Sequence, residues 1–139
     1  MGNQLTTLVN INFKEGENWT PVKGYSDYLV SSLGRVISLK RPNAKILTPS
    51  QDKEGYVHVR LYKEDKPSDD ERYSNGLKRA KLYKVHRLVA THFNQGNKAG
   101  LVVDHINMNK RDNRATNLRF VTQGENLRAW REAKKVLQA

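Results

Sequence analysis

A short segment near the C-terminal end of this 139-residue chain combines side chains that could carry out metal-assisted hydrolysis. Asp104 and His105 are neighbours, and Asn126 follows after a polar loop and a second apolar run. A hard cation such as Mg²⁺ prefers oxygen ligands and keeps several waters, so two protein oxygens suffice to hold it. A neutral imidazole can take a proton from an attacking water. We therefore predict that Asp104 and Asn126 bind a divalent metal and that His105 is the general base.

This predicted site imposes two geometric conditions on the fold. A histidine base works best when a carbonyl oxygen holds its second ring nitrogen, and Asn117 is the candidate for this role. Neighbouring side chains of an extended strand point to opposite faces, so Asp104 and His105 cannot both face one substrate group in a regular strand. We therefore expect the strand that carries them to end or twist at His105.

Local sequence patterns predict a strand, loop, strand and helix around these residues. The apolar runs 101–103 and 118–121 flank a polar loop whose residues can satisfy their own backbone, which favours an antiparallel hairpin. Thr122 and Glu125 match a capping box with Thr122 as the N-cap, so a helix is expected to begin there. The resulting ββα unit spans residues 101–137. The apolar stripe of its helix comprises Leu127, Trp130, Ala133 and Leu137.

The residues before this unit alternate in the manner of antiparallel strands. Residues 28–31 and 35–40 flank a Ser-Leu-Gly turn and predict a hairpin, and residues 56–62 alternate with period two. Residues 80–85 return to strand character before a helical pattern starts at His86. The expected fold class is therefore α+β, with a small N-terminal antiparallel β lobe. The predicted divisions are an arm (1–18), a β module (19–65), a polar loop (66–79) and the core that bears the site (80–139).

The formal net charge of +11 is the main compositional signal. Residues 81–139 hold 12 Lys or Arg against 4 Asp or Glu, whereas residues 1–80 hold 13 against 10. Positive charge is thus concentrated around the predicted site, as expected of a surface that binds a polyanion. A nucleic acid is the partner that fits both this charge and the predicted metal, because the metal can neutralise charge on a phosphate. Incidental basicity and binding to a membrane surface are the alternatives, and no strongly apolar helix favours the second.

Composition also excludes or disfavours several classes of protein. The chain has no cysteine, so disulfides, thiolate nucleophiles and cysteine-ligated zinc are excluded. No apolar run is long enough to span a bilayer, and residues 1–12 do not resemble a secretory signal. We expect a cytoplasmic protein with no membrane partner and no small-molecule cofactor. The sequence leaves the oligomeric state open between monomer and homodimer.

Basic residues in and around the predicted elements are candidate contacts to nucleic-acid phosphates. As a set they predict an affinity that falls steeply with salt, whereas any single one could be solvated surface. They are Arg35, Lys40, Arg41, Arg60, Lys84, Arg87, Lys110, Arg111, Arg114 and Arg119.

Several of these segments resemble the H-N-H endonuclease family, specifically its phage and intron-homing branch. The matching pieces are Trp19, Val22–Tyr25, Tyr28–Ser31, Leu33–Val36, Val85–Ala90, Val103–Lys110, Asn113, Asn117–Thr122 and Glu125-Asn126. The resemblance implies a ββα-metal (His-Me finger) nuclease core preceded by a small β DNA-binding module. It implies His105 as the general base, and Asp104 and Asn126 as ligands of Mg²⁺, for which Mn²⁺ can substitute. It further implies that Asn117 supports the histidine and the loop.

The resemblance therefore implies a metal-dependent DNA endonuclease that nicks one strand or breaks both. Its location would be the host-cell cytoplasm if the protein is phage-encoded. A non-catalytic DNA-binding protein that retains the fold, and an RNase of the same fold, remain as alternatives. One departure from the family pattern is Asn107-Met108, where Asp-Gly is usual after the histidine, and it predicts an altered turn.

The other histidines and the two tryptophans are assigned to structural roles. His86 and His92 could join His105 in a zinc site, but their spacing is poor for a single helix face. We interpret His86 as a packing or phosphate-contacting residue, His92 as helix packing, and His58 as an exposed strand residue. The core or interface anchors are Trp19 and Trp130.

Overall fold

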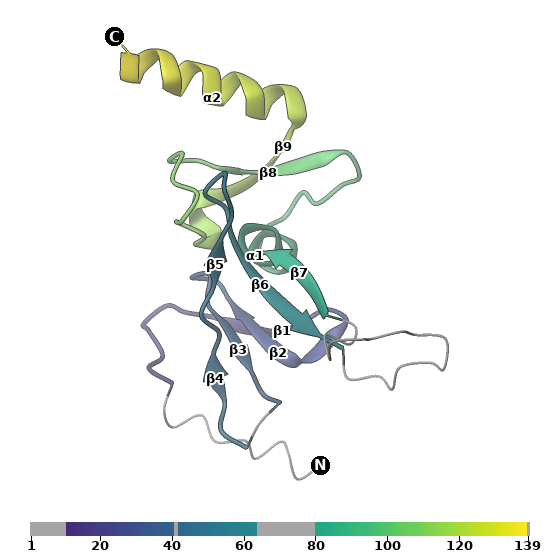
Figure 1. Cartoon of the computed structure of the whole chain (residues 1–139). Helices are drawn as coiled ribbons and strands as arrows, with labels where there is room; N and C mark the ends of the chain where they lie inside the picture. The colour runs from purple at the N-terminus through teal and green to yellow at the C-terminus, as the bar shows by residue number, and fades with distance from the viewer. Residues whose placement is uncertain (1–10, 41, 64–79, 139) are drawn as a thin grey trace.

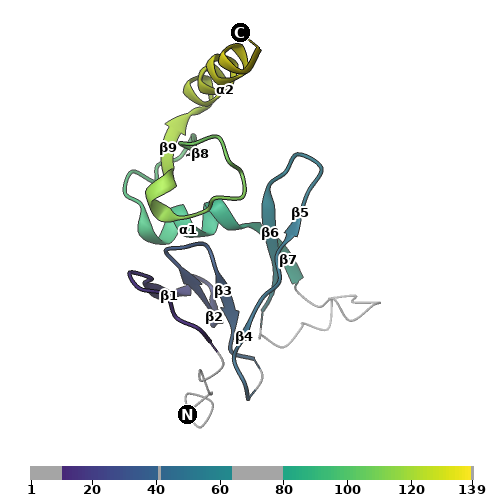
Figure 2. The same ribbon diagram turned by 90° about the vertical axis from the view of Figure 1, so that its left-hand side faces the viewer.

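The described part of the chain consists of a β-rich N-terminal lobe, a helix that crosses the centre and a C-terminal ββα unit (Figures 1 and 2). A computed structural model describes residues 11–40, 42–63 and 80–138. The arrangement confirms the predicted α+β class. Neither helix in these ranges has the length and apolar character that a membrane crossing requires.

An antiparallel four-stranded sheet forms most of the N-terminal lobe. Its strands lie in chain order and are β1 (Trp19–Val22), β2 (Tyr25–Ser31), β3 (Val36–Ser38) and β4 (Lys45–Ile46). Strands β2 and β3 confirm the predicted hairpin, with Leu29 paired to Ile37. In β2, Tyr28 and Val30 are buried on either side of the half-buried Leu29, because alternate side chains of a strand share one face.

A second antiparallel sheet links this lobe to the rest of the chain. Its strands are β5 (Ser50–Gln51), β6 (Val57–Tyr62) and β7 (Ala80–Lys84). The alternation predicted for β6 is present, since Val59 and Leu61 are buried and Arg60 is exposed. Because β7 pairs with β6, this sheet spans the predicted boundary between the β module and the core. The predicted polar loop 66–79 lies outside the described residues.

The ββα unit has the predicted order of elements. Strand β8 (Leu101–His105) pairs antiparallel with β9 (Leu118–Thr122), and α2 (Gln123–Gln138) follows directly. The capping box is confirmed, because the Thr122 N–H donates to Glu125 Oε1 at 2.9 Å and the Glu125 N–H donates to Thr122 Oγ1 at 3.1 Å. Such reciprocal bonds satisfy N–H groups that a helix start leaves without partners, so they fix the residue at which α2 begins.

One hydrophobic core is shared by the N-terminal lobe and the ββα unit. The helix α1 (Val85–Phe93) contributes its buried face to this core and lies between the β1–β4 sheet and the β8–β9 hairpin (Figure 2). Val30 comes from the first sheet, Leu61 from the second and Leu118 from the hairpin. The lobe and the ββα unit therefore depend on each other for burial of apolar surface, which is the main stabilising term in folding.

His92 fastens α1 to the N-terminal lobe. Its Nδ1 donates to the Leu88 carbonyl oxygen at 2.7 Å, and its Nε2 accepts the Lys23 N–H at 2.9 Å. Lys23 lies in the turn between β1 and β2, so the two bonds tie the helix to that turn. Because both ring nitrogens have partners here, His92 does not join His105 in the zinc site considered as an alternative.

Residues 11–18 are not a free arm, contrary to the prediction. Ile11 is buried with Ile37 and Ala44 in a second apolar cluster. The Glu17 carboxylate accepts a hydrogen bond from Arg35 Nε at 2.8 Å. Burial acts to raise the pKa of Glu17, but the hydrogen bonds that it accepts, led by those of Arg35, outweigh burial and lower the pKa to about 2. Residues 1–10 of the predicted arm lie outside the described residues.

Candidate active site

Strand β8 ends at His105, as the predicted site requires. A turn follows at once, in which the Met108 N–H donates to the His105 carbonyl oxygen at 3.0 Å. Across the hairpin, Asp104 pairs with Arg119 and His105 pairs with Leu118. The side chains of Asp104 and His105 are both buried, although they point to opposite faces of the strand. The two residues therefore lie at the loop end of the hairpin, one on each face.

Different helices cover the two faces of the hairpin. Leu118 shares the face of His105 and belongs to the core around α1, so His105 points toward α1. The ring of His86, on α1, lies 4.8 Å from the ring of His105 between centroids. Asp104 and Arg119 point the other way, to the face over which α2 lies (Figure 1).

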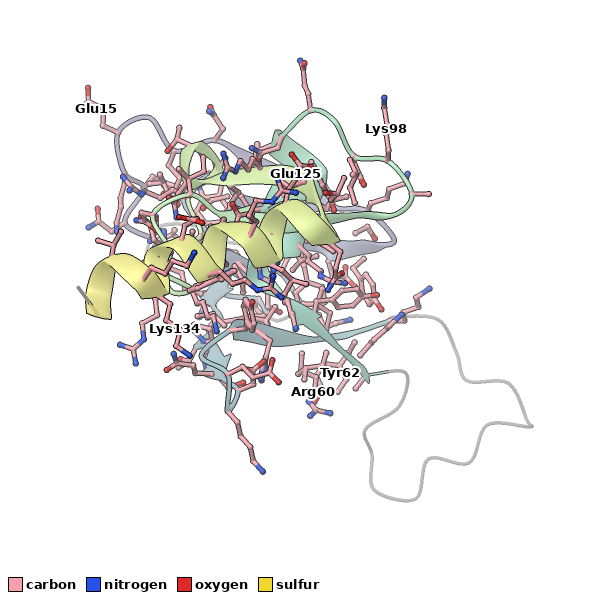
Figure 3. The ribbon with its side chains drawn as sticks, turned by 90° about the horizontal axis from the view of Figure 1, so that it is seen from above. Glu15, Arg60, Tyr62, Lys98, Glu125 and Lys134 are labelled. Carbon is pink, nitrogen blue, oxygen red and sulfur yellow. The ribbon has the colours of Figure 1, made fainter. Side chains whose placement is uncertain are left out.

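Helix α2 carries the second predicted metal ligand, Asn126. The helix starts beside Leu101, at the open end of the hairpin, and lies across the molecule when seen from above (Figure 3). Two turns further on, the ring of Trp130 lies 5.1 Å from Nζ of Lys110 in the loop that joins the strands. The helix thus runs along the hairpin from its open end toward that loop. Asn126 lies on this path, in the first turn of α2.

Each of the two predicted metal ligands has a buried oxygen atom without a hydrogen-bond partner among the described residues. Asp104 Oδ2 accepts a bond from Arg119 Nε at 3.0 Å, but Asp104 Oδ1 and Asn126 Oδ1 accept none. A buried polar atom without a partner costs free energy unless a ligand or water satisfies it. A carboxylate oxygen and a carboxamide oxygen form a donor set that suits a hard divalent cation completed by waters. The residues present therefore fit the predicted metal.

Asn113, rather than Asn117, holds the ring of His105. The distance between His105 Nε2 and Asn113 Oδ1 is 2.7 Å. A carboxamide oxygen can only accept, so Nε2 carries the proton and Nδ1 keeps its lone pair. The prediction that Asn117 holds this nitrogen is wrong, because the loop brings the earlier carboxamide to the ring.

Asn117 instead fixes the loop between the strands. It ends a 3₁₀ turn (Ala115–Asn117) and is buried. Its Oδ1 accepts the Asn107 N–H at 3.0 Å, and its Nδ2 donates to Asn107 Oδ1 at 2.9 Å and to the Asp112 carbonyl oxygen at 2.8 Å. These three bonds agree with the prediction that Asn117 supports the loop. Its effect on His105 is indirect.

Burial sets the protonation of two neighbouring imidazoles. It lowers the pKa of His105, against the opposing effects of the Asn113 hydrogen bond and the Asp104 charge. Burial, together with the nearby His105 ring and cations, lowers the pKa of His86 to about 3. The Tyr56 ring stacks on His86 at 5.2 Å between centroids. Both imidazoles are therefore neutral at neutral pH, which suits a base at His105 and the packing role predicted for His86.

The folded protein is expected to lose stability as the pH falls below about 6.5, the ordinary pKa of histidine. The unfolded chain binds a proton at His86 near that pH, whereas the folded chain resists protonation until about pH 3. The free energy of unfolding should therefore fall by up to about 1.4 kcal/mol per pH unit through this group. Urea unfolding between about pH 5 and 7 should give a shallower pH dependence for His86→Gln than for wild type. The control His58→Gln should keep the wild-type dependence, and an unchanged dependence in both variants would contradict the assignment.

The β2–β3 turn braces the loop that carries Asn113. The Ala115 N–H donates to the Ser32 carbonyl oxygen at 2.7 Å. Gly34 has a φ of +91°, and a Cβ at this position would lie 3.0 Å from Asn113 Cβ and 3.2 Å from the Asn113 carbonyl oxygen. Glycine avoids both the left-handed strain and the close contact. The N-terminal lobe thus positions the residue that holds His105.

Replacing Gly34 with alanine should therefore lower both stability and cleavage. A left-handed residue with a Cβ costs about 1–2 kcal/mol, and the added methyl must displace Asn113. Since a small misplacement of His105 misaligns the base, the single-turnover cleavage rate should fall about 10-fold or more. Gly24→Ala is the matched control, because its φ is +83° and an added Cβ meets nothing within 4 Å. It should lose comparable stability and keep the wild-type rate, and equal rates in the two variants would refute the positioning role.

Asn107-Met108 stands where the family usually has Asp-Gly, and this departure puts the side chain of Met108 on a left-handed turn residue. Met108 has a φ of 64°, a conformation that glycine adopts without cost. The turn is also held by Asn107 Oδ1, which accepts the Asn109 N–H at 2.9 Å. The backbone after His105 therefore tolerates strain at Met108.

Met108→Gly is expected to raise the free energy of unfolding by about 0.5–1 kcal/mol, because the relief of left-handed strain exceeds the entropy cost of glycine. Met108→Ala shortens the side chain but keeps the strain, so it should show no gain. Urea denaturation of both variants measures the difference. A loss of stability on substitution by glycine would mean that the packing of Met108 outweighs its strain.

Three arginines among the predicted phosphate contacts are engaged by carboxylates of the same chain. Arg119 donates to Asp104, Arg114 donates twice to Asp112 at 2.7 Å, and Arg35 forms its ion pair with Glu17. Hydrogen bonds from Arg114 lower the pKa of Asp112 to about 2, so this pair persists through the neutral range. The arginines keep exposed or half-buried surface, and their contacts to DNA stay predictions.

The remaining predicted phosphate contacts lie in several different environments. Lys84 and Lys110 each place Nζ 4.5 Å from the centroid of the Tyr56 ring, which stacks on His86. Arg60 and Arg87 are exposed. The others have local partners, since Lys40 pairs with Asp27 and Arg111 donates to Gln51. Arg41 lies outside the described residues.

Two family models match the chain, in the order predicted. The first is the NUMOD4 motif over residues 17–62, and the second is described as HNH endonuclease and covers residues 83–128. The two matches fall on the N-terminal lobe and on the part of the chain from β7 to α2 that carries the candidate site.

Similar proteins and a similar solved structure agree with these matches. DNA endonuclease I-HmuI of Bacillus phage SP01 is 42% identical over 110 residues, which is 78% of this chain and 55% of the relative. HNH endonuclease L247 of Acanthamoeba polyphaga mimivirus is 39% identical over 125 residues, which is 87% of this chain and 27% of the relative. A solved structure of I-HmuI matches with a TM-score of 0.69 and 38% identity, over 87% of this chain and 64% of that chain. The chain therefore spans about half the length of I-HmuI.

Proposed function

Because this chain belongs to the HNH endonuclease family and carries a NUMOD4 motif ahead of the nuclease segment, we propose that it hydrolyses phosphodiester bonds of double-stranded DNA. The similar solved structure is described as DNA binding and cleavage by the HNH homing endonuclease I-HmuI. The proposed partner also suits the charge of +11 carried by this chain.

The observation that carries the proposal is that the buried oxygens Asp104 Oδ1 and Asn126 Oδ1 lack partners, while His105, next to Asp104 in the chain, has a lowered pKa and a neutral ring. Asp104 and Asn126 would hold the cation, for which Mg²⁺ is the first choice and Mn²⁺ a substitute. When bound, a divalent cation supplies positive charge beside the scissile phosphate. Arg119 compensates part of the charge on Asp104 and leaves one carboxylate oxygen available.

His105 is proposed as the general base of this reaction. The ring keeps its Nε2 proton on Asn113, so Nδ1 is the atom that can accept a proton from the attacking water. Once protonated, the ring retains the Asn113 oxygen as an acceptor and the Asp104 charge nearby, and both favour the cationic form. The site therefore supplies a base that is neutral before the reaction and stabilised after it.

Incubation of supercoiled plasmid with the purified chain and Mg²⁺, Mn²⁺ or EDTA tests the proposal. Relaxed or linear plasmid should accumulate with either metal and not with EDTA, and a duplex labelled on each strand in turn should distinguish a nick from a double-strand break. Intact plasmid with every metal, together with salt-sensitive binding, would identify a non-catalytic DNA-binding protein. Preferential cleavage of single-stranded RNA would identify an RNase of the same fold.

A further inference from the structure

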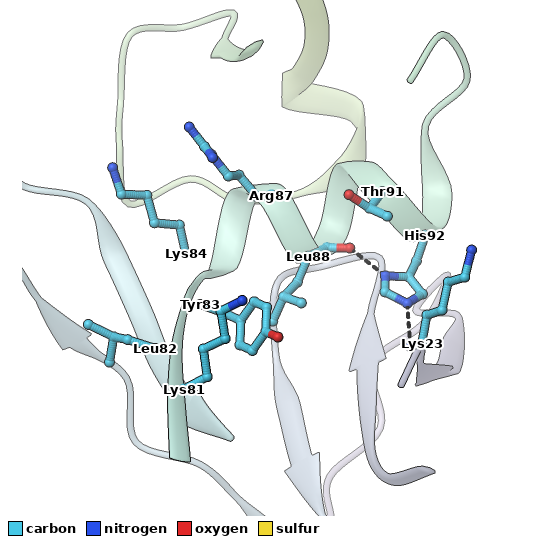
Figure 4. A pocket seen from close by; sticks show the side chains of 9 residues that line it. All are labelled: Lys23, Lys81, Leu82, Tyr83, Lys84, Arg87, Leu88, Thr91 and His92. Carbon is cyan, nitrogen blue, oxygen red and sulfur yellow. Dashed lines mark hydrogen bonds between the residues drawn. The ribbon is translucent and has the colours of Figure 1, made fainter. Parts of the chain in front are cut away.

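A basic cleft lies outside the candidate active site, where β7, α1 and the β1–β2 turn meet (Figure 4). Its volume is about 560 Å³. Of the nine described residues that line it, four are cationic, namely Lys23, Lys81, Lys84 and Arg87, and none is acidic. Clefts lined by charge of one sign focus the electrostatic field, so this one attracts anions more strongly than a flat surface of equal charge.

The neutral walls of the cleft are held in place by internal hydrogen bonds. The ring of His92 bonds to the Leu88 carbonyl oxygen and to the backbone N–H of Lys23, as the dashed lines in Figure 4 show. The Tyr83 hydroxyl bonds to the Tyr25 hydroxyl at 2.9 Å. Apart from Thr91, the polar side-chain groups left to bind a ligand are the four cations, which can only donate. A ligand rich in acceptors, such as a phosphate, therefore suits the cleft better than a base edge.

Lys84 connects the cleft to the aromatic rings that surround His105. Lys84 lines the cleft and also lies over the ring of Tyr56, at 4.5 Å. That ring stacks on His86, whose own ring contacts His105. Arg87 also lines a smaller cavity, to which residues 101–103 of β8 contribute. Lys110, in the loop after His105, also lies over the ring of Tyr56, so basic side chains flank this ring from both the cleft and the site.

We propose that this cleft binds the backbone phosphates of one DNA strand beside the cleavage position, with Lys23 and Lys81 as contacts in addition to Lys84 and Arg87. The proposal rests on the proposed function, because it takes double-stranded DNA as the partner. The α1 wall from Arg87 to His92 is about 7.5 Å long at 1.5 Å per residue. One strand of DNA carries a phosphate for about every 3.4 Å of helix axis, so the cleft accommodates roughly two phosphates.

The test compares two double variants with equal changes in charge, Lys23→Gln/Lys81→Gln in the cleft and Lys14→Gln/Lys98→Gln outside it. All four side chains are exposed, and the His92 bond uses the backbone of Lys23, so both variants should retain the fold. Binding of a labelled duplex is measured by fluorescence anisotropy in EDTA, at several KCl concentrations between about 50 and 200 mM. The slope of log K against log salt should fall by about 2 in the cleft variant, with affinity about 10-fold lower or more, because each lost phosphate contact removes about 0.9. The control variant should keep the wild-type slope.

Equal slopes in the cleft variant and the wild type would overturn the proposal and leave the proposed function standing. Equal losses of slope in both variants would also overturn it, since the effect would then be one of total charge. If only the cleft variant has a lower slope but the wild type never cuts plasmid, the result would support DNA binding in the cleft and refute the proposed cleavage. Wild-type protein that does not bind duplex at all would refute both proposals.

A free phosphate anion is the other source of the same chemistry, and a competition experiment separates it from DNA. Inorganic phosphate is added to the protein–duplex complex while KCl is lowered to hold the ionic strength constant. Displacement of duplex no greater than that by chloride supports a site for the DNA backbone. Displacement of duplex from wild type by millimolar phosphate, with no change of salt slope in the cleft variant, would instead assign the cleft to the free anion and overturn the proposal.

Discussion

Replacing His105 with alanine is expected to lower the rate of plasmid nicking by about 10²- to 10⁴-fold, which is the usual contribution of general acid–base catalysis. Asp104 and Asn126 remain in this variant, so metal and DNA should still bind. Single-turnover cleavage at saturating metal, with duplex affinity measured separately, isolates the chemical step. His58→Ala is the matched control, because it removes a half-buried imidazole on β6 that bonds to Ser50, and it should cleave at the wild-type rate. Undiminished cleavage by His105→Ala would defeat the mechanism.

The pH dependence of cleavage should reflect the lowered pKa of His105. Burial lowers this pKa, so the base form already predominates at neutral pH and the rate should fall only as the pH drops below about 6.5. The Asn113 hydrogen bond acts to raise the pKa. Asn113→Ala should therefore move the acid limb of the profile to lower pH, and also reduce the maximal rate because the ring loses its anchor. An acid limb that moves to higher pH in this variant would contradict the assigned bond.

Replacing Asp104 with asparagine is expected to lower cleavage by about 10²-fold or more at limiting metal, because the site loses its anionic ligand and several kcal/mol of charge stabilisation with it. The substitution preserves the shape of the side chain, so the hairpin should still form. Raising the metal concentration should restore part of the rate if metal binding is the step that is weakened. Cleavage at the wild-type rate and the wild-type metal dependence would exclude Asp104 as a ligand.

A second readout of Asp104→Asn does not depend on catalysis. A ligand that binds only the folded protein raises its Tm, so Mn²⁺ should raise the Tm of the wild type and raise that of the variant much less. Asp27→Asn is the matched control, because this carboxylate pairs with Lys40 at 3.2 Å in the N-terminal lobe. It should show the wild-type response to Mn²⁺. A full response in Asp104→Asn would mean that the ion binds elsewhere.

The local elements of the site were predictable from the sequence, because each depends on residues that are close along the chain. The start of α2 follows from the side chains of Thr122 and Glu125, three positions apart. The pairing of β8 with β9 follows from two apolar runs around a polar loop. The end of β8 at His105 agrees with the expectation that the strand ends or twists there. The sequence thus places Asp104, His105 and Asn126 on these elements, and their roles stay proposals.

The contacts between these elements were decided only by the tertiary structure. Asn113 and Asn117 are two carboxamides in one polar loop, and only the path of that loop selects Asn113 as the partner of His105. The contact of Gly34 with Asn113 joins segments that are far apart in the sequence, as does the stacking of Tyr56 on His86. The basic cleft likewise needs Lys23 beside residues of β7 and α1. Sequence patterns report neighbours along the chain, whereas these contacts exist because one hydrophobic core packs the N-terminal lobe against the hairpin.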